Sequence, residues 1–317
     1  MNAGELAALL APRITGVVGS DVLLAPHTTY RLGGTAALYI EPADVDDLAA
    51  LGEVITDTAE PVPVLVLGRG SNLVISDAGW PGVVVKLGAA FSYVQASESG
   101  SGLRAGGATP LPLLANWAAR RGLAGMEFAI AIPGSVGGAV RMDAGAHGRE
   151  IRDCLVAVDV WDLARGDRST LLPDDLDFDY RSSNLTDDQL VVAASFGLER
   201  GEPSEVRARM ESYRRHRAET QPGAAQNAGS VFRNPPGDHA GRLVEAAGLK
   251  GFTVGGARVS ELHANFFIAE DGATAQDVYE LVGRVIDKVR DTHGVELVPE
   301  IRFVGAFNDL LREGSTR

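Results

Sequence analysis

The chain has 317 residues, 45% hydrophobic and 22% charged, which is the composition of an ordinary globular protein with two or three domains. Its net charge of −13 argues against a general nucleic-acid binder, because phosphate contacts require a basic face, although local arginines could still bind an anionic substrate. The single cysteine, Cys154, excludes a disulfide framework and a cysteine metal cluster, fits a reducing compartment and is expected in the core. We find no targeting segment and no apolar run of about 18 residues, so we expect a cytoplasmic protein.

Hydrophobic periodicity and end signals predict a chain in which helices and strands alternate. Asp44 can cap the first well-defined helix, while Gly122 and Gly294 follow later ones, as expected for helix ends. The predicted helices are 44–55, 110–121, 205–218, 241–248 and 277–292, and the predicted strands are 37–40, 63–67, 83–87, 103–105, 156–162, 191–196 and 298–303, with a further strand entered within 259–268.

Two glycine-containing turns in the first third of the chain are candidate anion sites. Arg31 precedes the pair Gly33-Gly34 and could reach a phosphate, although a hairpin turn with a surface arginine fits equally well. A buried strand then breaks into Gly68-Arg69-Gly70-Ser71-Asn72, where positive φ would let N–H groups converge and Ser71 and Asn72 would add donors. A plain tight turn is the alternative, and the missing lysine and helix exclude both the P-loop and the Rossmann fingerprint.

Two small-residue stretches follow, Gly106-Gly107-Ala108 and Pro133-Gly134-Ser135-Val136-Gly137-Gly138-Ala139. Glycine leaves no side chain between the backbone and whatever lies above it, so the second stretch predicts a flat wall suited to a large planar cofactor. Close packing of two backbones is the alternative for either stretch.

Three polar residues are candidates for chemistry. Arg181 lies among aromatic and small polar residues and suits a guanidinium aimed at an anion, or else a surface ion pair. Ser230 follows Ala-Gly near Arg233 and Asn234, so its hydroxyl could be exposed on a tight backbone, or cap a helix. Glu300 follows a proline and is either a partly buried carboxyl or a solvated edge-strand residue. Without a Gly-x-Ser-x-Gly elbow, a serine hydrolase is excluded.

Six motifs, in this order, resemble the UDP-N-acetylmuramate dehydrogenase family, also called UDP-N-acetylenolpyruvoylglucosamine reductase, the flavoenzymes of peptidoglycan precursor synthesis. The resemblance runs from about residue 30 to residue 303. The motifs are Tyr30-Arg31-Leu32-Gly33-Gly34, Leu67-Gly68-Arg69-Gly70-Ser71-Asn72, Ile132-Pro133-Gly134-Ser135-Val136-Gly137-Gly138-Ala139, Tyr180-Arg181-Ser182-Ser183, Ala228-Gly229-Ser230-Val231-Phe232-Arg233-Asn234-Pro235 and Pro299-Glu300-Ile301-Arg302-Phe303.

The resemblance implies an α+β fold, with a two-part FAD-binding domain of the vanillyl-alcohol-oxidase (PCMH) type followed by a C-terminal α/β substrate-binding domain. The implied boundaries are 1–90 and 91–206 for the two FAD-binding subdomains, 207–303 for the substrate domain and 304–317 for a tail. It also implies a reaction in which NADPH reduces FAD and the enolpyruvyl group of UDP-N-acetylglucosamine enolpyruvate is reduced to give UDP-N-acetylmuramate.

The resemblance assigns roles that suit the residue chemistry. Arg181 would stabilise the enolate-like species, Glu300, if protonated, would donate a hydrogen bond to the same oxygens, and Ser230 would donate a proton to carbon. The implied FAD contacts are Arg31, Gly68, Arg69, Gly70, Ser71, Asn72, Leu73, Gly107, Pro133, Gly134, Ser135, Gly137, Gly138 and Ala139, and the implied substrate contacts are Tyr180, Arg233, Asn234, His263 and Asn265.

Two departures from the family pattern flank the flavin wall: Asp143 stands where asparagine is usual, and His147 where an aromatic residue, often tyrosine, is usual. The competing interpretations are another FAD oxidase on the same scaffold and a non-catalytic flavin or UDP-sugar sensor. Partners other than NADPH and the sugar nucleotide are not expected, neither nucleic acid nor membrane, and the protein is expected to be a monomer.

Overall fold

The computed structural model describes residues 2–98, 100–223 and 225–308. The chain forms two compact units and enters each more than once. Unit 1 comprises Met1–Val22, Ala36–Arg69 and Pro81–His216, and unit 2 comprises Leu23–Thr35, Gly70–Trp80 and Arg217–Arg317. Two segments from the N-terminal third therefore fold with the C-terminal part of the chain. The division into 1–90, 91–206, 207–303 and a tail stays a prediction, and residues 309–317 of that tail lie outside the described residues.

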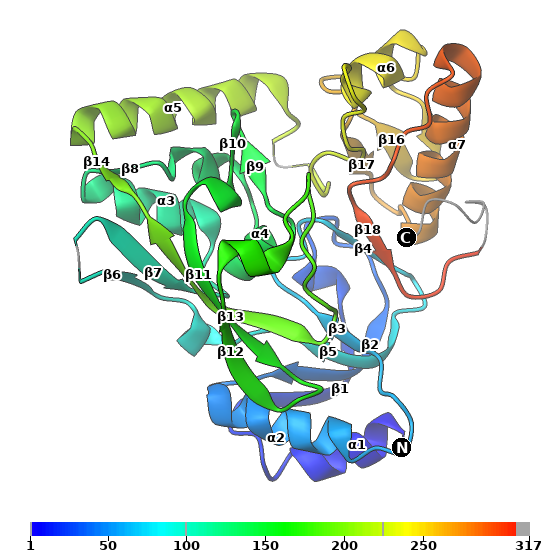
Figure 1. The fold of residues 1–317 in the computed structure, drawn as a ribbon. Coiled ribbons are helices and arrows are strands. Elements are labelled where there is room, and N and C mark those ends of the chain that lie inside the picture. The colour runs from blue at the N-terminus through cyan, green and yellow to red at the C-terminus, as the bar shows by residue number, and fades with distance from the viewer. Residues whose placement is uncertain (1, 99, 224, 309–317) are drawn as a thin grey trace. The chain divides into compact units, whose positions relative to one another are not determined.

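The first sheet of unit 1 has the strand order β1-β2-β5-β3, with β3 and β5 parallel. Two helices cover it (Figure 1), because their buried leucines join the apolar side chains of β2 and β5 in one core. Asp44 caps the second helix as predicted, since its side chain accepts hydrogen bonds from two first-turn N–H groups. The elements are α1 (Ala3–Leu10), β1 (Val17–Leu23), β2 (Thr35–Glu41), α2 (Val45–Thr56), β3 (Val64–Val66) and β5 (Trp80–Val85).

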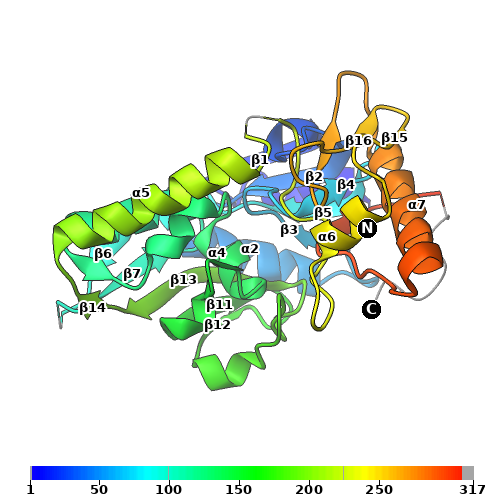
Figure 2. The same ribbon diagram turned by 90° about the horizontal axis from the view of Figure 1, so that it is seen from above.

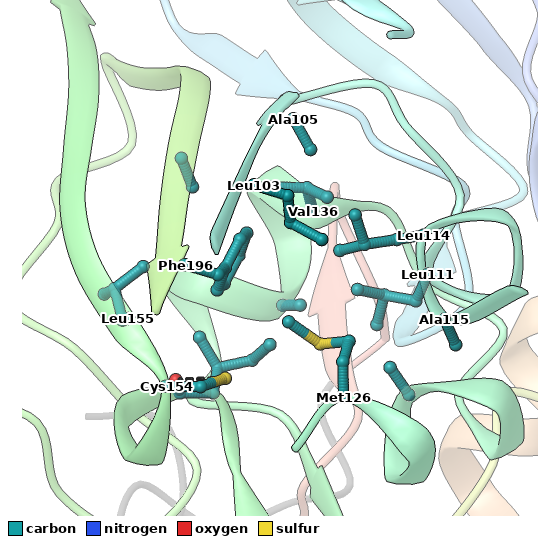
Figure 3. Packing of buried hydrophobic residues seen from close by; sticks show 14 of the residues in the cluster. Leu103, Ala105, Leu111, Leu114, Ala115, Met126, Val136, Cys154, Leu155 and Phe196 are labelled. Atoms are coloured by element: carbon teal, nitrogen blue, oxygen red, sulfur yellow. Dashed lines mark hydrogen bonds between the residues drawn. The ribbon is translucent and has the colours of Figure 1, made fainter. Parts of the chain in front are cut away.

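The second sheet of unit 1 is antiparallel, with the order β12-β11-β13-β7-β6. The central strand, β13, has a nearly continuous run of apolar residues because both of its faces are buried. Val191 belongs to one core and Val192 to the other. Figure 3 shows the first of these cores, in which side chains of β7 meet those of the helix that follows it. The elements are β6 (Val94–Ala96), β7 (Gly102–Gly106), α3 (Leu111–Arg120), α4 (Val136–Arg141), β11 (Leu155–Asp162), β12 (Asp167–Leu171), β13 (Gln189–Gly197) and α5 (Pro203–Thr220).

Cys154 lies in this core and is 6% exposed, as expected from the sequence, and burial raises the pKa of its thiol to about 12. Two pairs of two-residue strands complete unit 1. They are β8 (Leu123–Ala124) with β14 (Glu199–Arg200), and β9 (Gly145–Ala146) with β10 (Arg149–Glu150).

Unit 2 has a three-stranded antiparallel sheet, β15-β16-β17, and a parallel pair formed by β4 and β18. The long helix α7 runs beside β15 and β16 (Figure 2) and buries the predicted face of Val278, Leu281, Val285 and Val289. It ends at Gly294, which adopts a left-handed conformation. The elements are β4 (Leu73–Ile75), α6 (Ala240–Ala246), β15 (Thr253–Val254), β16 (Ala257–Val259), β17 (Phe267–Ala269), α7 (Ala275–His293) and β18 (Arg302–Val304).

All five predicted helices are confirmed, to within a few residues at their ends. The strand predicted over 298–303 is wrong for residues 298–301, because β18 begins only at Arg302. The preceding residues make a single bridge between Phe232 and Pro299, which is consistent with the lack of a backbone N–H at proline. Within the described ranges, no helix is long and apolar enough to span a membrane.

Candidate active site

The loop after β3 lies against the predicted flavin wall within unit 1. The Nε of Arg69 donates a hydrogen bond to the carbonyl of Pro133 at 3.0 Å. A Cβ added to Gly68 would lie 2.7 Å from the Oγ of Ser135, so the glycine is what permits this approach. Two motifs that are 64 residues apart in sequence thus come together, as expected if both contact one cofactor.

The rest of the loop belongs to unit 2. Gly70 has φ +60°, and a Cβ there would lie 2.5 Å from the carbonyl oxygen of His27, so a side chain is excluded on both counts. Asn72 donates from Nδ2 to the carbonyl of Glu300 at 3.0 Å, which ties the glycine loop to a predicted catalytic segment. Ser71 and Leu73, on either side of Asn72, are half-buried.

Arg31 lies in unit 2, in the turn before β2. Its side chain is exposed, and its backbone has φ +54°, a conformation that non-glycine residues seldom adopt. An exposed guanidinium on such a turn suits an anion ligand and also fits the alternative of a surface arginine, so the predicted phosphate contact stays a prediction.

The flavin wall is a short glycine helix, α4, whose first turn is capped by Ser135. Close packing of backbones explains why glycine occupies positions 107 and 137. The Gly137 N–H donates to the Gly107 carbonyl at 2.9 Å, and a Cβ on Gly107 would lie 1.8 Å from the Val191 carbonyl oxygen. Gly138 differs, because it is exposed and a Cβ there would meet nothing nearer than 3.6 Å. Only this last glycine leaves a bare backbone open to a ligand.

The residues next to these glycines make contacts within the protein itself. The Gly134 carbonyl accepts the N–H of Leu111 at 3.0 Å, and Ala139 is buried at 2% exposure. Within unit 1, the bare Gly138 surface and the approach at Gly68 leave a side-chain-free surface that fits a planar ring. Within unit 2, the loop around Gly70 carries backbone N–H groups and side-chain donors that fit a diphosphate.

Arg181 is held by three acceptors within unit 1, and 15% of its side chain is exposed. Its Nη1 contacts the Oε1 of Glu150 at 2.9 Å and the carbonyl of Asp143 at 3.2 Å. Its Nη2 donates to the carbonyl of Gly145 at 3.0 Å, and its guanidinium lies 4.8 Å from the centre of the Tyr180 ring. The backbone of Arg181 has φ +59°, so the arginine is fixed at both ends.

Glu150 and Arg152 complete an ion-pair network that the sequence did not reveal. The Oε2 of Glu150 lies 2.8 Å from Nη2 of Arg152, and Nε of Arg152 lies 2.6 Å from Oδ2 of Asp143. Asp143, one of the two departures from the family pattern, is 0% exposed. Burial raises the pKa of its carboxyl, and the positive charge of Arg152 opposes that rise. The alternating charges of Glu150 and Arg152 after a glycine turn were the only sequence signal.

His147, the second departure, occupies the tip of the β9–β10 hairpin. Its ring stacks on Tyr213 of α5 with 3.9 Å between centroids, and His216 approaches edge-on at 5.6 Å. The residue is exposed overall, but one ring face is covered by Tyr213. Burial of the ring, with a smaller contribution from His216, lowers the pKa of His147.

Ser230 and Glu300 lie on neighbouring backbone segments of unit 2. The N–H of Glu300 donates to the carbonyl of Val231 at 2.7 Å, and both Ser230 and Glu300 are half-buried. Ser230 caps no helix, because α6 begins only at Ala240. Among the described residues, the Ser230 hydroxyl has no hydrogen-bond partner, so it is available to a ligand.

Asn265 supports the same segment from the other side. Its Oδ1 accepts the N–H of Phe232 at 2.9 Å, its Nδ2 donates to the carbonyl of Phe232 at 2.8 Å, and the residue is 4% exposed. Both ends of the amide are therefore used to hold the backbone beside Ser230. Its expected substrate contact stays a prediction.

The other predicted substrate residues of unit 2 surround this segment. Asn234 accepts the N–H of Ala240 at the start of α6, and the backbone of Arg233 pairs with Val298. The Nδ1 of His263 accepts the N–H of Asn265 at 3.2 Å, which leaves Nε2 as the donor on a neutral ring, and burial lowers the pKa of this histidine.

Comparison with known proteins first defines the class. An FAD-binding domain family model matches residues 36–171, so the chain carries an FAD-binding domain. The model of the UDP-N-acetylenolpyruvoylglucosamine reductase C-terminal domain matches residues 221–304. The chain belongs to the UDP-N-acetylenolpyruvoylglucosamine reductase family.

Relatives match almost end to end. The reductase of Sphingopyxis alaskensis is 43% identical over 93% of this chain and 97% of its own, and that of Paramagnetospirillum magneticum is 40% identical over 95% and 96%. The crystal structure of the Thermus caldophilus reductase (MurB) superposes with a TM-score of 0.78 at 36% identity, covering 91% of this chain and 99% of that one. The predicted fold class, a two-part FAD-binding domain followed by a C-terminal α/β domain, is confirmed.

Proposed function

We propose that this protein uses NADPH and FAD to reduce the enolpyruvyl group of UDP-N-acetylglucosamine enolpyruvate, giving UDP-N-acetylmuramate for peptidoglycan precursor synthesis. Family membership supports the reaction class. The single structural observation that supports it most is the hydrogen bond from the Glu300 N–H to the Val231 carbonyl, which places the backbone of Glu300 beside the segment that carries the Ser230 hydroxyl.

Residues of both units bind the cofactor in this proposal. In unit 1, Gly68, Arg69, Pro133 and Gly138 form the wall against which a planar ring packs. In unit 2, the loop that begins at Gly70 supplies N–H and side-chain donors for the diphosphate, with Arg31 as a further cation. The other predicted contacts except Gly107 belong to the same two segments, and Gly107 lies between β7 and α3, where its carbonyl accepts the Gly137 N–H. FAD, when bound, accepts hydride from NADPH and supplies it to the terminal carbon of the enolpyruvyl group.

Three residues of the chain then handle charge and protons. Arg181 faces negative charge that develops on the substrate carboxylate, and its fixed guanidinium needs little reorganisation. A protonated Glu300 donates a hydrogen bond to the same oxygens, and Ser230 gives its proton to the carbon next to the carboxylate. Removing the arginine or the serine costs about 2–4 kcal/mol of barrier, by analogy with single donors in oxyanion sites.

The remaining proposed substrate contacts are Tyr180 in unit 1 and, in unit 2, Arg233, Asn234, His263 and Asn265. These residues would bind the sugar diphosphate directly or support the backbone that binds it. The proposed location is the cytoplasm, supported by the single cysteine. The proposed monomer is tested by light scattering at micromolar concentration.

The test of the reaction is anaerobic NADPH consumption by the yellow purified protein, with and without UDP-N-acetylglucosamine enolpyruvate. We expect turnover only with the sugar nucleotide. Ser230→Ala should leave flavin reduction intact and abolish turnover, whereas Ser212→Ala, which removes an exposed hydroxyl on α5, should change neither. Steady flavin reoxidation by air with no response to the sugar nucleotide would favour an FAD oxidase instead.

A further inference from the structure

One rung of the β9–β10 hairpin supplies two acceptors for Arg181 within unit 1, the Gly145 carbonyl and the Glu150 carboxylate. Gly145 and Glu150 are paired directly across this hairpin, and its turn is His147-Gly148, with φ +54° and +75°. Positive φ at both turn positions is the geometry of a tight two-residue hairpin, which fixes the pairing register. The two acceptors are therefore held at a set spacing.

Gly145 leaves the room that this arrangement needs. A Cβ on Gly145 would lie 3.0 Å from Nη1 of Arg181 and 2.7 Å from Cγ of Glu150. The missing side chain thus lets the carboxylate and the guanidinium meet beside the hairpin backbone. The same Cβ would lie 2.6 Å from the carbonyl oxygen of Arg149, so the hairpin backbone also requires a glycine here, although its φ is not positive.

Glu150 has one oxygen for each of two arginines. Oε1 contacts Arg181 and Oε2 contacts Arg152, while Arg152 is anchored by the buried Asp143 and by the carbonyl of Phe178 at 3.2 Å. The result is a row of alternating charges that includes Asp143, Arg152, Glu150 and Arg181. Each side chain in this row is held by an ion pair with the next one, because moving any of them breaks an ion pair.

We propose that Glu150 is a positioning residue that aims the guanidinium of Arg181 at the substrate carboxylate, with Asp143 and Arg152 holding Glu150 in place. The proposal rests on the proposed function, in which Arg181 meets the substrate. Glutamine at position 150 has one acceptor and one donor end, so it can satisfy either Arg181 or Arg152 but not both.

The test measures each half of the reaction separately in the holoenzyme by anaerobic stopped flow. Glu150→Gln should slow reoxidation of the reduced enzyme by UDP-N-acetylglucosamine enolpyruvate by about 10–100-fold, as expected for a misplacement of about 1 Å. Flavin reduction by NADPH should be unchanged. If the glutamine variant does not fold, Glu150→Asp, which keeps the charge but is one methylene shorter, makes the same comparison.

A double-mutant cycle separates positioning from a merely structural role. Because Glu150 acts through Arg181, the pair Glu150→Gln/Arg181→Lys should be no slower than Arg181→Lys alone. The matched control is Asp159→Asn, since Asp159 also lies between two arginines, Arg104 and Arg168, in unit 1 but outside the site. It should leave reoxidation unchanged.

Additive effects in the cycle, or reoxidation of Glu150→Gln at the wild-type rate while Arg181→Lys is slow, would overturn the inference and leave the proposed function standing. A wild-type enzyme that is reduced by NADPH but never reoxidised by the sugar nucleotide would overturn both.

Discussion

Asn265→Ala should destabilise unit 2 and disturb the segment that carries Ser230. The amide of Asn265 pairs with both the N–H and the carbonyl of Phe232, and Phe232 is only 1% exposed. Alanine would leave these two main-chain groups without a partner and out of reach of bulk water. The Asn265 side chain therefore makes the two main-chain hydrogen bonds with Phe232 that a neighbouring strand would otherwise make.

The magnitude follows from those two groups. An unsatisfied buried donor or acceptor costs about 1–3 kcal/mol, so the loss of both predicts a fall of about 2–6 kcal/mol in the free energy of unfolding. The bond from Glu300 to Val231 still holds the segment on its other side. We therefore expect the variant to fold, with slower proton donation by Ser230 and unchanged flavin reduction.

The assay is equilibrium urea unfolding, followed by fluorescence and far-UV circular dichroism, together with the two half-reactions. Asn184→Ala is the control, because Asn184 also donates from its amide to a main-chain carbonyl, at 2.9 Å, but is exposed. It should cost less than about 1 kcal/mol.

Asn265→Asp refines the test. One carboxylate oxygen can still accept the N–H of Phe232, but the other faces the Phe232 carbonyl, and two acceptors repel. Protonation would restore a donor, so this variant should gain stability relative to wild type as the pH falls. If Asn265→Ala unfolds with the wild-type free energy, or if its reoxidation rate is unchanged, the positioning of Ser230 by Asn265 is refuted.

Three further predictions concern unit 1. Asp47→Asn should lower the free energy of unfolding by about 2–4 kcal/mol in urea titrations, because three backbone N–H groups bind the carboxylate. Burial alone would raise the pKa of Asp47, but these bonds lower it, so the stabilisation it gives is present above about pH 4 and is lost in acid. Gly107→Ala should fold poorly in expression trials, since its Cβ would lie 1.8 Å from a carbonyl oxygen of β13. Folding lowers the pKa of His147 through burial against Tyr213 and the nearby His216, so the unfolded chain binds the proton more readily and stability falls below about pH 6.5. Thermal unfolding measured from about pH 7.5 to about pH 5.5 should show a smaller loss of stability in His147→Phe than in the wild type. An unchanged dependence of stability on pH would contradict this prediction.

The long elements were predictable from sequence because their signals are local. Asp44 and Gly294 mark helix ends within one turn, and the α7 face repeats apolar residues from Val278 to Val289, over about three turns. Strands of two or three residues carry no such signal. The hairpin of β9 and β10 and the edge strand β6 were missed for this reason, since pairing across a sheet, and not local preference, defines them. The longer edge strands β1 and β12 were missed as well, because their residues are exposed or half-buried and give no apolar signal.

The site was predictable as a set of motifs but not as an arrangement. The sequence offered Arg181 as a fixed cation or a surface ion pair, and the structure shows a guanidinium held by an ion pair with 15% of its side chain exposed. It offered Ser230 as an exposed hydroxyl or a helix cap, and the structure shows a half-buried serine that caps no helix. It could not show that Glu150 holds Arg181, because that contact depends on the register of a two-residue hairpin. Nor could it separate Gly107, which serves backbone packing, from Gly138, which leaves an open surface.

Backbone strain gives an independent indication of where the site lies. Among the described residues, six besides glycine have positive φ, and four of them, Arg31, Asp143, His147 and Arg181, lie in or beside the predicted site motifs. Each such residue costs on the order of 1 kcal/mol, and such strain persists only where surrounding contacts determine the conformation. At Arg181 those contacts are the Glu150 carboxylate and two carbonyls, and at His147 the stack on Tyr213. Arg181→Gly and Arg181→Ala both remove the guanidinium, but only glycine relieves the strain, so the glycine variant should be the more stable of the two by about 1 kcal/mol while both lose reoxidation. Equal stability of the two variants would contradict the presence of strain at this position.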